Sequence, residues 1–277
     1  MARPAESDGF LILITFILFL LINFNLEIGI IYGFMAFIGW QYYNEAVRGN
    51  FDAVPIERPG TDRMASLVVA AGVYIAFIFL ASFITTRVDP NAILEFDSNF
   101  AYISFLVAVS FSATPILSGS KFLRHVVWGV LIPIIETKTF FRSVFQWAVH
   151  FFRLKFPTNI FSSTALIVSS AIGFAFALFH ILAKGITSNS ALLVTFLFGF
   201  VSVEMVIFFK QALEAIFLHI ITNTIATMQQ LGNGFFSVGA TGFEFSGIVL
   251  LGSSLLISWF ILFQEFPFIT PARRVAA

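Results

Sequence analysis

The chain has 277 residues, of which 58% are hydrophobic, 39 are phenylalanine and 11% are charged. This composition excludes an ordinary soluble domain and predicts an integral membrane protein. The fifteen basic and fifteen acidic residues cancel and lie mostly between apolar runs, so no nucleic-acid partner is expected. The sequence contains no cysteine, which excludes disulfides, thiolate nucleophiles and thiolate metal sites.

Nine apolar runs are candidates for membrane-crossing helices, because a bilayer core of about 30 Å takes roughly 20 helical residues. The first two runs are short and could form one hairpin, so eight or nine transmembrane helices are expected. No cleavage site of small residues follows the first run, which we interpret as a retained anchor. The nine runs span residues 10–24, 28–43, 64–86, 99–117, 126–151, 160–183, 191–209, 211–228 and 245–263.

The sequence shows no repeat at a fixed period and no linker long enough to separate two domains. The expected fold class is therefore all-α, a polytopic integral membrane helix bundle that forms a single domain over residues 1–277. Pro133 lies inside the run at 126–151. A proline there kinks the helix or marks its first turn, and it frees nearby backbone carbonyls.

The longest polar connection, residues 44–63, carries Arg48, Arg58 and Arg63. The positive-inside tendency places this connection, and with it the N-terminus, in the cytoplasm. The sequence does not identify which cellular membrane holds the protein. One crossing per run then assigns Lys121, Arg124 and Lys184 to the cytoplasmic side and Arg87, Arg153, Lys155, Arg273 and Arg274 to the opposite side.

Few ionisable side chains remain inside the apolar runs, namely Glu136, Arg142, His180, Glu204, Glu214 and His219. Each costs about 2.5 to 3.5 kcal/mol when it faces lipid, so we expect them to face inward and to pair with one another. Asn223 follows His219 by one helical turn, so the two share a helix face. Glu214 is one turn from Lys210, which favours a structural ion pair, and His150 is expected at a membrane interface.

Glu136, His180, His219 and Asn223 are residue types that together support hydrolysis. A carboxylate near two imidazoles can deprotonate a water, and an imidazole or carboxamide can stabilise the oxyanion that forms on attack. We therefore predict these four residues as catalytic, with no cofactor. The zinc alternative stays open, because two histidines and one carboxylate also form a zinc site, although no His-Glu-x-x-His run is present.

Two motifs resemble those of a known family. The chain has Phe-x-x-x-His at Phe176 to His180 and His-x-x-x-Asn at His219 to Asn223, on successive apolar runs. This pattern resembles the CAAX protease and bacteriocin-processing (CPBP) family of intramembrane glutamate proteases, which includes the Ras-converting prenyl endopeptidases. The resemblance covers residues 126–228, as a catalytic-type core, and it implies a supporting role for Phe176.

The first motif of that family, Glu-Glu-x-x-x-Arg, is altered here to Glu136-Thr-Lys-Thr-Phe-Phe-Arg142, with a single acid and one extra residue. Successive residues of a regular helix advance about 100°, so Glu136 and Arg142 would differ by roughly 240° and would not share a face. A π-bulge could absorb the extra residue, and such bulges are frequent at functional sites. In a regular helix, Glu136 could still face the histidines while Arg142 serves a structural role.

The resemblance implies a metal-independent endopeptidase in which Glu136 activates water and His180, His219 and Asn223 assist. Its implied substrate is a membrane-associated peptide or protein, lipidated C-terminal segments included, and its other partner is the lipid bilayer. The altered first motif supports an alternative, a catalytically silent family member that binds a membrane-protein partner as an accessory subunit. An enzyme is the favoured interpretation.

Overall fold

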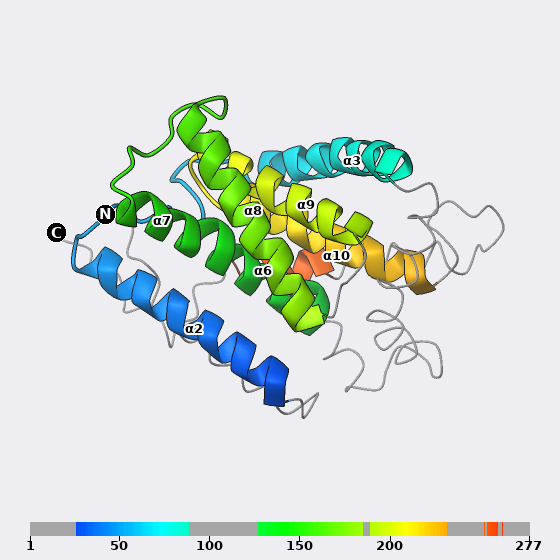
Figure 1. Ribbon diagram of the computed structural model, residues 1–277, viewed down its shortest axis with the longest axis horizontal. Helices are drawn as coiled ribbons and strands as arrows, with labels where there is room; N and C mark the ends of the chain where they lie inside the picture. Colours follow the sequence, from blue (N-terminus) through cyan, green and yellow to red (C-terminus); the bar gives the residue numbers. More distant parts are fainter. Residues whose placement is uncertain are drawn as a thin grey trace.

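The computed structural model describes residues 26–88, 127–184, 189–231, 252, 254–259 and 262 (Figure 1). Within these residues every regular element is helical and there is no strand, so the prediction of an all-α fold is confirmed. The predicted runs at 10–24 and 99–117 lie outside the described residues, as does most of the run at 245–263.

Three of the described helices are long and apolar enough to cross a membrane, over Arg63–Ile84, Ser163–Ala183 and Asn189–Phe209. They belong to α3, α8 and α9, and each agrees with a predicted apolar run. The helices of the described residues are α2 (Leu26–Val47), α3 (Arg63–Val88), η1 (Val127–Leu131), α6 (Ile132–Glu136), η2 (Thr137–Val144), α7 (Phe145–Phe151), α8 (Ser163–Lys184), α9 (Asn189–Phe209) and α10 (Leu213–Leu231).

The centre of the bundle is formed by α8, α9, α10 and the helical segment that runs from η1 to α7. Figure 1 shows α2 and α3 on opposite sides of this centre, and α3 packs against α10 while α2 packs against η2. The largest fully buried side chains come mostly from the central elements, and they include Phe141, Phe145, Phe176 and Phe217. The helices that carry the predicted site are therefore the innermost ones.

The segment from Val127 to Phe151 is one helical run with two π-helical stretches, η1 and η2. Pro133 lies between them, in the first turn of α6. Because proline lacks an amide hydrogen and crowds the preceding turn, it disturbs the regular α-helical pattern there. The hydroxyl of Ser143 donates to the carbonyl of Lys138, five residues earlier, at 2.9 Å. Of the two alternatives that the sequence left open, a π-helical insertion and a regular helix, the structure has the π-helical one.

Glycines bring α8 and α9 into close contact. A Cβ atom on Gly173 would lie 2.8 Å from the carbonyl oxygen of Phe196, and one on Gly199 would lie 2.9 Å from the Cα of Gly173 and 3.2 Å from the Cβ of Phe176. Small residues allow helix backbones to approach in this way in membrane bundles. The contact places α9 directly against the part of α8 that carries Phe176.

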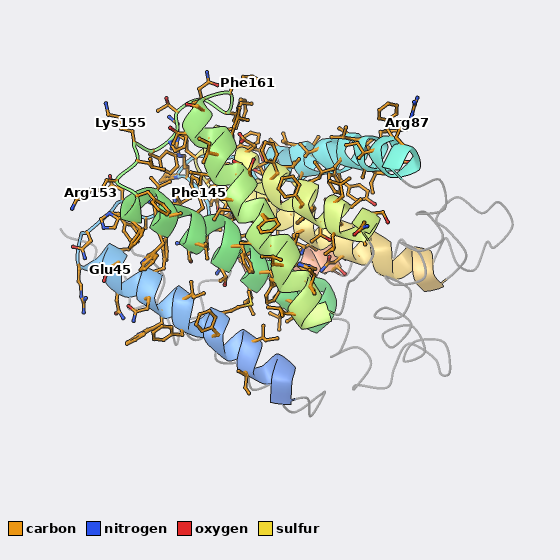
Figure 2. The ribbon with its side chains drawn as sticks, viewed as in Figure 1. Glu45, Arg87, Phe145, Arg153, Lys155 and Phe161 are labelled. Carbon is orange, nitrogen blue, oxygen red and sulfur yellow. The ribbon has the colours of Figure 1, made fainter. Side chains whose placement is uncertain are left out.

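Residues 48–62, 152–162 and 210–212 gather at one end of the bundle, which we call the loop end. The ring of Phe51 lies 5.4 Å from that of His150. The amide of Ala212 donates to the carbonyl of Pro55 at 3.1 Å, and Arg58 Nε donates to the carbonyl of Lys210 at 3.2 Å. Figure 2 shows Arg153 and Lys155 at this end and Arg87 at the far end of α3.

The predicted side of Arg153 and Lys155 is wrong. The contacts at the loop end place these two residues at the same end of the bundle as Arg48 and Arg58, whereas the sequence predicted the opposite end. Lys184 was also assigned wrongly, because α8 starts at the loop end and finishes at the other. The start of α3 and the end of α7 both lie at the loop end. Three successive crossings by the apolar runs at 64–86, 99–117 and 126–151 would place these two ends on opposite sides.

Candidate active site

The side chains of Glu136, His180 and His219 meet inside the bundle, from α6, α8 and α10. Glu136 Oε2 lies 3.4 Å from His219 Nε2 and 4.0 Å from His180 Nε2. All three residues are buried, with Glu136 fully so. The expected inward pairing of these groups is therefore confirmed, and Glu136 lies within the reach of one hydrogen bond or one water from both imidazoles.

Aromatic rings surround the two imidazoles. The Phe176 ring contacts His180 edge-on at 4.3 Å between centroids and also contacts His219 at 5.8 Å. Phe198 of α9 lies 4.9 Å from His219, and Phe140 packs against Phe176 at 5.3 Å. Apolar walls of this kind lower the local dielectric, which strengthens the electrostatic interactions of the carboxylate and the imidazoles.

Hydrogen bonds fix the orientation of both rings. His180 Nδ1 donates to the carbonyl of Phe176, one turn earlier, at 2.8 Å. His219 Nδ1 lies 2.9 Å from the hydroxyl oxygen of Thr137. Each imidazole therefore turns its Nε2 toward Glu136. Phe176, predicted as a supporting residue, contributes both a carbonyl acceptor and a ring that packs on His180.

Thr137 is a site residue that the sequence analysis did not single out. It follows Glu136 directly and is fully buried. In an alignment on Glu136, Thr137 stands where the resembling family has its second glutamate. The sequence signal for Thr137 was its position directly after Glu136. A residue next to the predicted catalytic carboxylate lies within reach of the helices that carry the two histidines.

Arg142 contacts groups at the loop end. Its Nε donates to the carbonyl of Val54 at 2.6 Å, and its guanidinium lies over the ring of Tyr42, 5.0 Å from the centroid. Arg142 is 4% exposed, so these contacts are sheltered from water. They tie η2 to α2 and to the 51–62 segment, which is a structural role.

Asn223 lies on α10 one turn after His219 and is partly exposed. Its spacing places it on the same helix face as His219. Asn223 is thus positioned nearer the edge of the buried cluster than the two histidines.

Glu214 does not pair with Lys210, which corrects the predicted ion pair. Glu214 Oε1 accepts from Ser66 at 2.8 Å and from Gln211 at 2.7 Å. Lys210 has a positive φ of 53° and is exposed. The spacing argument assumed one continuous helix, whereas α9 ends at Phe209 and α10 begins at Leu213. His150 is exposed at the loop end, as predicted for an interfacial residue.

Glu204 lies outside the cluster of Glu136, His180 and His219. It lines an apolar cavity of about 400 Å³ between α3, the start of α8 and α9, with Val73, Phe161 and Phe208 among its other lining residues. Within the described residues, neither carboxylate oxygen of Glu204 has a hydrogen-bond partner.

The donor set of Glu136, His180 and His219 matches zinc chemistry by residue type. Across the part of the chain that the structure describes, no group of three His, Asp or Glu side chains has the spacing of a metal site.

Comparisons of this chain with protein-family models, with curated proteins and with solved structures found no match.

Proposed function

We propose that this protein is an intramembrane endopeptidase of the CAAX-protease type. The observation that supports this function best is the position of Glu136, whose Oε2 lies 3.4 Å from His219 Nε2 and 4.0 Å from His180 Nε2 in a buried, aromatic-lined cluster. A buried carboxylate beside two imidazoles is a common arrangement for activating water. The Phe176 to His180 and His219 to Asn223 motifs support the same family.

The geometry allows one water between Glu136 and His180. Two acceptors 4.0 Å apart can both bind one water at ordinary hydrogen-bond lengths of about 2.8 Å. In the proposed reaction, Glu136 takes a proton from this water as its oxygen attacks the peptide carbonyl carbon. Glu136 then passes that proton to the departing amine nitrogen as the C–N bond breaks.

His219 and Asn223 provide donors for the oxyanion. In the resting site, His219 Nε2 lies near the Glu136 carboxylate at 3.4 Å. Once Glu136 has accepted the water's proton it is a weaker acceptor, so the N–H of His219 can turn to the oxygen that develops negative charge. The Asn223 carboxamide, one turn away, supplies a second donor by the same resemblance.

The proposed substrate is a membrane-associated peptide or protein, with lipidated C-terminal segments included. This proposal comes from the family resemblance together with the apolar surroundings of the site. We propose that residues 1–277 form one polytopic membrane domain with eight or nine transmembrane helices. Its catalytic-type core spans residues 126–228.

The loop end is proposed to face the cytoplasm, because the described basic residues gather there. Arg48, Arg58, Arg63, Arg153, Lys155 and Lys210 lie at or next to this end, whereas Arg87 and Lys184 lie at the other. Cytoplasmic segments carry an excess of Lys and Arg. This sidedness also keeps the N-terminus in the cytoplasm, if residues 10–24 cross once before α2.

The activity is tested with the purified protein in lipid nanodiscs and a panel of prenylated and unmodified peptides, with products identified by mass spectrometry. We expect cleavage that persists in a strong zinc chelator. Cleavage that vanishes with the chelator and returns with added zinc would instead establish a zinc enzyme. A complete lack of cleavage, with a folded protein, would contradict the peptidase proposal.

One observation favours a second function, that of a catalytically silent accessory subunit. Thr137 occupies the position of an acid that the resembling family carries beside its catalytic glutamate. The accessory function predicts that Glu136→Gln and His219→Ala leave the biological role of the protein intact. The peptidase function predicts its loss with both variants.

A further inference from the structure

The hydroxyl of Thr137 bonds a side chain of another helix rather than its own backbone. Thr195 and Thr222 each donate to the carbonyl four residues earlier, both at 2.7 Å, and Ser143 donates to the carbonyl five residues earlier. Thr137 instead reaches across to His219 Nδ1 at 2.9 Å. Within the described residues this is the hydroxyl's sole hydrogen bond, and Thr137 is fully buried.

The chemistry of this contact favours one position for the proton of His219. A buried hydroxyl that has one partner is satisfied best when it donates its hydrogen to that partner. Nδ1 of His219 must then carry a lone pair, because a protonated Nδ1 could not accept. In the neutral ring the hydrogen is therefore on Nε2, and it is directed at the Glu136 carboxylate 3.4 Å away.

His180 has the opposite arrangement. Its Nδ1 lies 2.8 Å from the carbonyl of Phe176, and a carbonyl oxygen can only accept, so Nδ1 carries the hydrogen. The Nε2 of a neutral His180 is then a lone pair that faces Glu136 Oε2 at 4.0 Å. Glu136 thus has a donor on one side and a proton acceptor on the other.

We infer that Thr137 is a positioning residue, which holds His219 as a neutral Nε2–H donor and leaves the mobile proton of the site to Glu136 and His180. A carboxylate at position 137 would accept from Nδ1 and favour the charged imidazolium, whereas a hydroxyl donor favours the neutral ring. The catalytic meaning of this inference rests on the proposed peptidase function, but the tautomer of His219 does not.

The tautomer is measured by nitrogen NMR of the full-length protein in nanodiscs at neutral pH, with all four histidines labelled with ¹⁵N. The His219 signals are assigned by their loss in His219→Gln. In the wild type we expect an unprotonated Nδ1 and a protonated Nε2 for His219, and the reverse pattern for His180. A His219 that is protonated on Nδ1 would overturn the inference without any variant.

Thr137→Val removes the hydroxyl at nearly constant shape, and Thr137→Ser retains it. We expect the His219 signals of Thr137→Ser to match the wild type, whereas those of Thr137→Val shift toward the Nδ1-protonated forms. The kcat for peptide hydrolysis should fall about tenfold in Thr137→Val, as expected for one lost hydrogen bond, and recover in Thr137→Ser. Unchanged His219 signals in a folded Thr137→Val would overturn the positioning role.

The two proposals fail in different ways. If the wild type shows the expected His219 tautomer but cleaves no peptide, the peptidase function is wrong and the Thr137 contact stands. If the wild type cleaves peptides but Thr137→Val keeps both the wild-type His219 signals and the wild-type kcat, the Thr137 inference is wrong and the peptidase function stands.

Discussion

Three buried charged side chains in this bundle, Glu136, Glu214 and Arg142, are held by specific partners on other elements. Glu136 meets two imidazoles, Glu214 accepts from Ser66 and Gln211, and Arg142 donates to a backbone carbonyl. Such partners offset the free energy that a polar group loses when it leaves water. The cost alone predicted from the sequence that these residues face inward. The same argument could not identify Thr137, because burying a threonine hydroxyl costs much less free energy than burying a charged group.

At the residue scale, Arg142→Met should destabilise the fold by about 1 to 3 kcal/mol, because it removes a charged donor and leaves the buried Val54 carbonyl with only the Tyr42 hydroxyl as donor, at 3.3 Å. The lost contact with the Tyr42 ring adds to this effect. Thermal unfolding in nanodiscs measures the change. Arg48→Met is the control, since Arg48 has a side chain that is 68% exposed and pairs with Glu45 at the surface. An Arg142→Met protein that melts with the wild type would contradict the structural role of Arg142.

The helical run from Val127 to Phe151 shows what one extra residue does to an element. A regular helix would turn Glu136 and Arg142 to faces roughly 240° apart. The π-helical η2 between them changes this register, so that Glu136 reaches the histidines while Arg142 reaches Val54. The motif spacing and Pro133 left both such an insertion and a regular helix open. The sequence could not fix its extent, because π-helical turns depend on packing with α2, α8 and α10.

The contact between α8 and α9 is tested with Gly173→Ala. The new methyl would lie 2.8 Å from the carbonyl oxygen of Phe196, so the helices must separate at an expected cost of about 1 to 3 kcal/mol. Gly72→Ala on α3 is the matched control, since nothing lies within 4 Å of its added methyl and alanine favours a helix by up to about 1 kcal/mol.

Gly173→Ala should therefore lower the melting temperature and the peptidase rate, because Phe176 and His180 follow on the same face of α8. Gly72→Ala should lower neither. Equal melting temperatures for the two variants would contradict the close contact between the α8 and α9 backbones at Gly173.

For the whole molecule, three separate stretches of chain meet at the loop end, and they carry five of the ten described basic residues. Counting apolar runs misplaced Arg153 and Lys155, since each run was taken as one passage. The contacts of Phe51 with His150 and of Arg58 with Lys210 correct this. Sidedness depends on how many passages the whole chain makes, a property that local hydropathy does not determine.

The native chain contains no cysteine, so Lys155→Cys and Arg87→Cys each introduce a single thiol at an exposed position. In membrane vesicles sealed with the cytoplasmic face outward, a membrane-impermeant maleimide should label Lys155→Cys directly and Arg87→Cys only after permeabilisation. This follows because the two positions lie at opposite ends of the bundle, with Lys155 at the loop end (Figure 2). Labelling of both variants from the same side would contradict the proposed topology.

The central claim is that Glu136 activates water for peptide hydrolysis, and the most direct measurement compares kcat for Glu136→Gln and Glu204→Gln in nanodiscs. Both variants exchange an intramembrane glutamate for its isosteric amide, but Glu204 lies in a separate apolar cavity. We predict that kcat falls about 10²- to 10⁴-fold in Glu136→Gln and stays near the wild-type value in Glu204→Gln. A folded Glu136→Gln protein with the wild-type kcat would contradict the claim.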